Sequence, residues 1–259
     1  MKTTLRVFVG IDATSSIRSS ANRSLSKLRR NFPEVAWSDD SLFHVTVKFL
    51  GDVALEDLND VISALRAACK EVAPFQLTFQ GFGVFPNVSR PRVVWIGVDD
   101  PDGGAVELAE RVDLELSDLG FPPTDNYRPH LTVGRIKSKT SAPTSLAVEL
   151  EKEKDALFGS VIVDYVTLYS SERNEAGKLV YAPLAEIELG DPDEDMDELV
   201  DSFGFEEETK SPKKDSAPQS PIPNAVKLDF AALDADLDEE LRALCGDKFV
   251  DDSKRKKKR

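Results

Sequence analysis

Two short stretches share one pattern: FHVTVKFLG at residues 43–51 and RPHLTVGR at residues 128–135. In each, a histidine is followed two positions later by a threonine, and valine or leucine takes the alternate positions. The chain has two histidines in all, His44 and His130, and both occupy this pattern. Alternation of this kind is typical of a β-strand with one buried face.

The alternation assigns the side chains of both stretches to two faces. Side chains at positions i and i+2 of a strand point the same way, so His44 is expected beside Thr46, and His130 beside Thr132. Four apolar residues are expected to face the core: Val45, Val47, Leu131 and Val133. Each half of the chain places its histidine strand between helices and follows it with more strands. We therefore predict two similar lobes whose histidine strands face each other.

Two imidazoles and two hydroxyls on one surface suit the hydrolysis of a phosphodiester. Attack and departure at phosphorus need a base on one side and an acid on the other. An imidazole with an ordinary pKa of about 6.5 can serve in either form near neutral pH. Threonine hydroxyls can donate hydrogen bonds to the non-bridging oxygens, where negative charge builds. The alternative, in which both histidines are structural, must explain why they share one pattern.

The first 190 residues predict an α+β fold with largely antiparallel sheets. Residues 5–11 (LRVFVGI) form an apolar strand, and Thr14 or Ser15 can cap the helix that follows. A strand break is expected at Gly51-Asp52. Strands are expected at residues 5–11, 43–50, 75–85, 92–98, 130–136, 160–169 and 179–189. Helices are expected at residues 15–30, 55–72, 105–119 and 145–154.

Composition divides the chain near residue 190. Residues 1–190 contain 27 acidic and 21 basic side chains, and they are expected to form one domain. Residues 191–259 contain 20 acidic and 12 basic side chains, with a Pro/Ser/Lys stretch and a basic end at 254–259, and they are expected to be disordered. The net charge of -14 argues against a general grip on duplex nucleic acid, but it allows recognition of one terminal phosphate.

Little in the sequence points to a metal or a cofactor, and we predict neither. Cys69 and Cys245 lack paired spacings, and Cys69 fits the buried side of a helix. Acidic residues do not cluster with the histidines at ligand spacing. Gly103-Gly104 lacks the lysine of a phosphate loop, which argues against an ATP-dependent ligase. Without a membrane-length apolar run or a signal-peptide pattern, a cytoplasmic protein that does not contact membranes is expected.

Both histidine stretches resemble the paired motifs of the 2H phosphoesterase superfamily. The similarity is strongest to the bacterial and archaeal RNA 2',3'-cyclic phosphodiesterases, also called the 2'-5' RNA ligase family. Leu5–Asp12 resembles the opening strand of that family, and Pro91–Val98 resembles its central strand. The resemblance covers residues 3–189 and implies two lobes with antiparallel sheets around a V-shaped cleft. Small departures occur at Phe43, where the family often has leucine, and at Gly134, where it often has alanine.

The resemblance also implies a role for each motif residue. His44 would be the proton donor to the departing ribose O3', and His130 the proton acceptor that activates water, leaving a 2'-phosphate. Thr46 and Thr132 would bind the phosphate. Arg135 is expected on the strand face of His130 and Thr132 if pairing is regular, where it would add a charged donor. The alternative for Arg135 is a surface position at a strand end.

Other functions are compatible with these residues. The same site can join RNA ends reversibly through a 2'-5' linkage without ATP, or hydrolyse a small cyclic nucleotide or sugar phosphate. A different class of protein would bind RNA ends without catalysis and act through residues 191–259. The expected partner is an RNA with a 2',3'-cyclic phosphate end or a small cyclic nucleotide, bound by a monomer. Tyr127 and Phe49 are candidates to stack on the terminal base.

Overall fold

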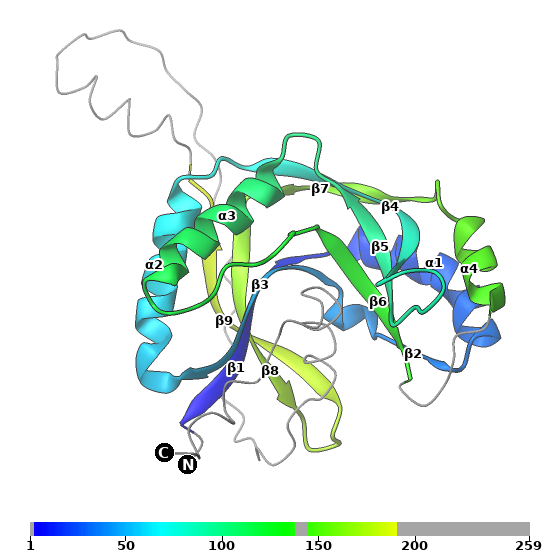
Figure 1. The fold of residues 1–259 in the computed structure, drawn as a ribbon, viewed down its shortest axis with the longest axis horizontal. Helices are drawn as coiled ribbons and strands as arrows, with labels where there is room; N and C mark the ends of the chain where they lie inside the picture. The colour runs from blue at the N-terminus through cyan, green and yellow to red at the C-terminus, as the bar shows by residue number, and fades with distance from the viewer. Residues whose placement is uncertain (1–2, 138–143, 191–259) are drawn as a thin grey trace, which may run out of the picture.

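A computed structural model of the protein describes residues 3–137 and 144–190 (Figure 1). These residues form a curled antiparallel sheet with helices packed against it, which confirms the predicted α+β class. The strands are β1 (Thr4–Asp12), β2 (Val35–Trp37), β3 (His44–Ala54), β4 (Phe75–Phe85), β5 (Val93–Asp99), β6 (His130–Ile136), β7 (Leu157–Val163), β8 (Tyr165–Arg173) and β9 (Leu179–Glu188). The helices are α1 (Ser15–Asn31), α2 (Leu58–Lys70), α3 (Gly104–Ser117) and α4 (Thr144–Glu151), with 3-10 turns η1 (Asp40–Leu42) and η2 (Leu55–Asp57).

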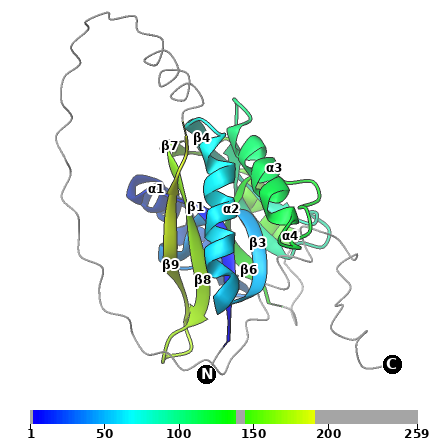
Figure 2. The same ribbon diagram turned by 90° about the vertical axis from the view of Figure 1, so that its left-hand side faces the viewer.

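The sheet consists of two similar halves. Its strand order is β7-β4-β5-β6-β3-β1-β8-β9, and β2 also pairs with β6. We call β3, β1, β8 and β9 the first half-sheet, and β7, β4, β5 and β6 with β2 the second half-sheet. Helices α2 and α3 pack on each other and contact the first half-sheet, with α3 also reaching β4, whereas α1 and α4 contact the second half-sheet (Figures 1 and 2). This arrangement confirms the predicted pair of antiparallel lobes.

The half-sheets meet at the two strands that carry the histidines. Strands β3 and β6 pair at one position, Val45 with Leu131. Both side chains are 0% exposed, and Val47 and Val133 are equally inaccessible at 1% and 0%. The residues of the motif strands that were predicted to face inward are therefore confirmed as core residues. Their burial determines which face of each strand points to the core.

Helix α1 begins where the sequence indicated. The Thr14 hydroxyl accepts a hydrogen bond from the Ile17 amide at 3.4 Å, as an N-cap side chain does. One face of the helix is buried, through Ile17, Ala21, Leu25 and Leu28, and this spacing of three or four residues is that of an amphipathic helix. The cap and the buried stripe together hold α1 against the second half-sheet.

The single strand predicted at residues 160–169 is wrong. The structure has two strands, β7 and β8, separated at Asp164. Strand β7 pairs with β4 in the second half-sheet, whereas β8 pairs with β1 in the first. Residues 160–169 contain no glycine or proline that would mark the change of partners.

The predicted break at Gly51-Asp52 is also wrong. Strand β3 continues to Ala54, and Gly51 adopts a φ of 70° beside a register shift opposite Val7 and Phe8. A β-bulge absorbs the glycine within the strand and bends it, so the ladder resumes beyond it. The short strand β2 was not predicted, because three residues are too few for a periodic pattern.

Some sequence predictions fall outside the described residues. These are the disorder of 191–259, the basic cluster at 254–259 and the environment of Cys245. Within the described part of the chain, every helix is too short or too polar to cross a bilayer.

Candidate active site

The four motif side chains lie together on one face of the sheet. Around the Val45–Leu131 pair, antiparallel geometry brings Thr46 opposite His130 and His44 opposite Thr132. The alternate residues point to the buried face, so these four side chains share the other one. The structure thus brings together the residues that the two sequence stretches indicated. We call His44, Thr46, His130 and Thr132 the motif quartet.

Each histidine ring is held in the same way by a nearby carbonyl. His44 Nδ1 lies 2.7 Å from the Leu42 carbonyl oxygen, and His130 Nδ1 lies 2.8 Å from that of Arg128. A carbonyl oxygen can only accept, so the Nδ1 atoms carry hydrogen in both rings. Proton transfer is therefore left to the Nε2 atoms, which is the arrangement that a general acid or base needs.

The quartet is partly shielded from solvent. His130 is 5% exposed and Thr46 is 8% exposed, whereas His44 and Thr132 are half-buried. Thr46 Oγ1 lies 3.0 Å from His44 Nε2, where it can accept from an imidazolium or donate to a neutral ring. Shielding of this degree strengthens hydrogen bonds to a bound phosphate relative to those in open water.

Aromatic rings support both histidines, and the sequence did not identify them. The His44 ring lies 4.7 Å from the Phe8 ring and meets the Tyr181 ring edge-on at 5.1 Å. The His130 ring meets the Phe85 ring edge-on at 5.0 Å. Of these three aromatic residues, only Phe8 lies in a stretch that the sequence analysis had singled out, the one that resembles the opening strand of the family. The contacts of Tyr181 and Phe85 depend on how distant strands align.

A small polar network lies next to His44. Asp12 pairs with His44 across β1 and β3, and its carboxylate accepts hydrogen bonds from the Tyr169 hydroxyl and from Arg18 Nη2. Burial, together with this hydrogen bond to Asp12, raises the pKa of Tyr169. Tyr169 therefore stays a donor at neutral pH and keeps the Asp12 carboxylate oriented beside the histidine strand.

Arg135 lies on the expected face, but the expected reason, regular pairing, is wrong. Regular alternation from Thr132 would place Arg135 on the buried face, together with Val133. The pairing is irregular, because Thr132 pairs with Trp95 and Arg135 pairs with Val93, with a register shift between. Trp95 and Val93 are two residues apart on β5, so their partners share a face. A β-bulge thus brings Arg135 to the quartet's side.

The other residues considered in the sequence have different surroundings. Cys69 is 0% exposed, and burial raises the pKa of its thiol to about 12, in agreement with a core role. Burial, followed by the Asp100 carboxylate, raises the pKa of the Tyr127 hydroxyl. Phe49 pairs with Phe8, so it shares the face of His44. Strand pairing therefore places Phe49, one of the two candidates for base stacking, on the quartet's face.

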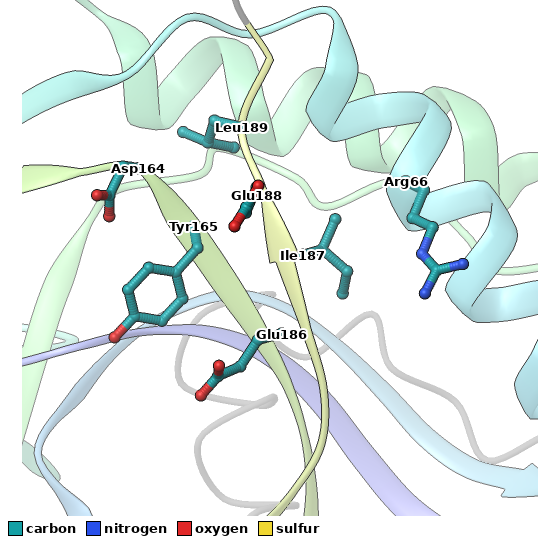
Figure 3. A pocket seen from close by; sticks show the side chains of 7 residues that line it. All are labelled: Arg66, Asp164, Tyr165, Glu186, Ile187, Glu188 and Leu189. Atoms are coloured by element: carbon teal, nitrogen blue, oxygen red, sulfur yellow. The ribbon is translucent and has the colours of Figure 1, made fainter. Parts of the chain in front are cut away.

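A pocket of about 730 Å³ lies away from the quartet (Figure 3). It is lined by Arg66 of α2 and by the ends of β8 and β9, and it contains three carboxylates: Asp164, Glu186 and Glu188. None of the quartet lines it. Its acidic lining would repel a phosphate, so it is not a candidate for the chemistry described above.

Replacing Phe85 by leucine is expected to lower kcat by about two- to tenfold with little change in KM. Phe85 links His130 to Trp95, whose ring centroid is 5.1 Å away. Such aromatic contacts contribute about 0.5–1.5 kcal/mol beyond burial, and their loss would let the His130 ring reorient. Steady-state kinetics on a cyclic phosphodiester, with separate kcat and KM, measures the effect.

The matched control is Phe82→Leu. Phe82 lies on the same strand and contacts Phe158 at 5.2 Å, so it makes an aromatic pair that does not involve a histidine. Its replacement should leave kcat unchanged. Equal kcat values for Phe85→Leu and Phe82→Leu would show that the Phe85 ring does not position His130.

Comparison with known proteins gives consistent matches. Residues 18–175 match the model of the 2'-5' RNA ligase superfamily. A protein of Methanothermobacter thermautotrophicus named RNA 2',3'-cyclic phosphodiesterase is 33% identical over 175 residues, which are 68% of this chain and 94% of that protein. A protein of the same name from Aquifex aeolicus is 33% identical over 188 residues, which are 72% of this chain and 98% of that protein.

The fold is also found in solved structures. A crystal structure of a Thermus thermophilus protein aligns with a TM-score of 0.60 and 26% identity. The alignment covers 72% of this chain and 100% of that protein. The uncovered part of this chain is thus close in size to residues 191–259, for which the sequence resemblance also found no counterpart.

Proposed function

Because the chain belongs to the 2'-5' RNA ligase superfamily, we propose that it hydrolyses 2',3'-cyclic phosphate ends of RNA to 2'-phosphomonoesters. The observation that carries the proposal is the matched pair of histidines on one sheet face, each with Nδ1 at a backbone carbonyl. Two similarly held rings leave two Nε2 atoms for proton transfer at one substrate. The reaction needs no metal in this proposal, because the histidines supply both proton-transfer groups.

The proposed reaction is one in-line displacement. His130 Nε2 takes a proton from water while the water oxygen bonds to phosphorus. The bond from phosphorus to O3' breaks, and His44 Nε2 gives its proton to O3'. The products are a 2'-phosphate and a free 3'-hydroxyl. The division of roles between the histidines follows the family resemblance.

The other quartet members would stabilise the charged phosphorane-like state. The hydroxyls of Thr46 and Thr132 can donate to the non-bridging oxygens from opposite strands. Arg135, on the same face, would add a charged donor. Hydrogen bonds to developing charge in a shielded site lower the barrier more than equal bonds in water.

The same geometry bears on the other functions. Joining through a 2'-5' linkage follows the same steps with a ribose hydroxyl of a second RNA in place of water, and cleavage of that linkage runs them backwards, so one site allows both directions. Small cyclic nucleotides carry the same reacting group, and only measured kcat/KM values separate them from RNA. A protein that only binds RNA ends would not need two histidines whose Nε2 atoms are both placed for proton transfer.

The test is hydrolysis of a short RNA with a 2',3'-cyclic phosphate end in the presence of EDTA. We expect full turnover in EDTA and a 2'-phosphate as the sole product isomer, identified by ³¹P NMR. A 3'-phosphate product would reverse the assignment of the leaving oxygen. Loss of turnover in EDTA with recovery on adding Mg²⁺ or Zn²⁺ would contradict the metal-independent mechanism.

A further inference from the structure

A second pocket, of about 880 Å³, lies beside the motif quartet. Its lining comes from parts of residues 33–42, from Arg135 and Ile136 at the end of β6 with Lys137 after them, from Lys178 and the first residue of β9, Leu179, and from Arg29. We call it the flanking pocket. It adjoins the quartet at Leu42, whose carbonyl holds the His44 ring. It spans both half-sheets, since β6 belongs to the second and β9 to the first.

The lining of the flanking pocket is basic. It includes Arg29, Arg135, Lys137 and Lys178, against the carboxylates of Asp39 and Asp40. The first 190 residues as a whole have the opposite balance, with 27 acidic and 21 basic side chains. An excess of positive charge next to a phosphate-handling site, in an otherwise acidic domain, is the local signature of contact with a polyanion.

Three of these cations are held in place by contacts at the pocket wall. Lys178 Nζ lies 2.8 Å from Asp39 Oδ2, Arg29 Nη2 donates to the Ser38 carbonyl at 2.9 Å, and Lys137 Nζ donates to the Pro33 carbonyl at 2.8 Å. The Lys178 ammonium, followed by the Ser41 contacts, holds the pKa of Asp39 well below its usual range. These contacts hold the three cations in place among the residues that line the pocket.

The position of the pocket limits what its ligand can be. Arg135 lines the pocket and is three residues along β6 from Thr132, and Leu42 lines it two residues before His44, so the pocket is next to both strands of the quartet. A 2',3'-cyclic phosphate is the 3' terminus of its strand, and all other nucleotides extend from it in the 5' direction. Any RNA chain attached to a bound cyclic end must therefore leave the quartet, and the flanking pocket offers a basic surface beside it.

We propose that the flanking pocket binds the RNA backbone immediately 5' of the terminal nucleotide, so that the preferred substrate is an oligonucleotide and not a mononucleotide. This inference rests on the proposed function. The contacts would be to phosphates, through Lys137 and Lys178, and therefore independent of base sequence. Arg135 lies at the boundary, where the pocket meets the quartet.

The experiment compares kcat/KM for a 2',3'-cyclic mononucleotide and for a trinucleotide with the same terminal nucleoside. We expect at least tenfold higher kcat/KM for the trinucleotide. Its kcat/KM should also fall with salt, with a slope near -0.7 per phosphate contacted in a log–log plot. A trinucleotide with uncharged methylphosphonate linkages should lose most of the preference, because it keeps the bases but not the charges.

Two variants test the residues. Lys178→Ala and Lys137→Ala should each lower the trinucleotide-to-mononucleotide ratio of kcat/KM by about two- to fivefold, the range for exposed charge pairs. Lys178→Arg should restore it. The matched control is Lys27→Ala, because Lys27 is also an exposed lysine paired with a carboxylate, Glu149 at 3.0 Å, and lies outside the pocket.

The outcomes are distinct. Turnover of the mononucleotide by the wild-type protein tests the proposed function without the pocket. If both substrates react with equal kcat/KM, or if the preference survives in the Lys137→Ala/Lys178→Ala double variant, the inference is wrong while the proposed function stands. If neither substrate reacts, the proposed function fails and the inference fails with it.

Discussion

Replacing His130 by asparagine is expected to lower kcat/KM for a cyclic phosphate end by about 10²- to 10⁴-fold, the range that general acid–base groups contribute. The asparagine amide can still donate to the Arg128 carbonyl, which His130 Nδ1 contacts at 2.8 Å. It has no atom that exchanges a proton at the Nε2 position. His44→Asn should have an effect of similar size, since His44 Nδ1 has the same kind of contact with Leu42.

The two histidine variants are best interpreted together. Residues that act as a unit give non-additive losses, so the His44→Asn/His130→Asn double variant should be little worse than either single one. Thermal unfolding of each variant, followed by circular dichroism, separates loss of chemistry from loss of fold. A folded single variant with kcat/KM within about threefold of wild type would show that its histidine does not transfer a proton.

Replacing Asp113 by alanine is expected to cost about 3–5 kcal/mol in the free energy of unfolding. Lys48 is almost fully buried, with 2% of its side chain exposed, and it pairs with Asp113 of α3. Its ammonium also donates to the Pro122 carbonyl at 2.7 Å. Removing Asp113 leaves the Lys48 ammonium buried without its carboxylate partner, and burying an uncompensated charge is costly. Urea unfolding at constant pH measures it.

A second substitution distinguishes two causes of the destabilisation: the unpaired buried ammonium of Lys48 and the lost contacts of the Asp113 side chain. Lys48→Met in the Asp113→Ala background removes the buried ammonium, so it should recover much of the lost stability. Glu107→Ala, on the same helix, breaks an exposed pair with Arg111 at 3.8 Å and should cost less than about 1 kcal/mol. A similar small cost for Asp113→Ala would mean that Lys48 is not effectively buried.

Asp113 also links the stability of the fold to the position of the motif quartet. Its carboxylate accepts from the Thr124 amide at 2.6 Å, so the buried pair anchors the loop that leads to Arg128 and His130. The sequence did not single out either member of this pair. In regular alternation Lys48 would share the face of Thr46, but a register shift opposite Val9 and Gly10 turns it to the helix side.

Much of the local structure followed from pattern. The strands at 75–85 and 130–136 have the predicted bounds, and the cap is Thr14, one of the two predicted candidates. Period-2 alternation and turn residues are local properties, so they are visible in one sequence. The burial of Val45 and Leu131 follows from the same alternation. The catalytic roles of His44 and His130 stay predictions, because position alone does not measure proton transfer.

Local pattern alone was enough to show which two strands carry the histidines, which of their side chains face the core and what chemistry four polar groups could perform. It could not show that Asp164 separates two strands, that Tyr181 and Phe85 support the rings, or that Arg135 joins the quartet's face, all of which depend on the folded sheet. Strand register and β-bulges are properties of a pair of strands, so they are not determined by the sequence of either strand alone. One residue of slip reverses the face of a side chain, and no local pattern records that slip.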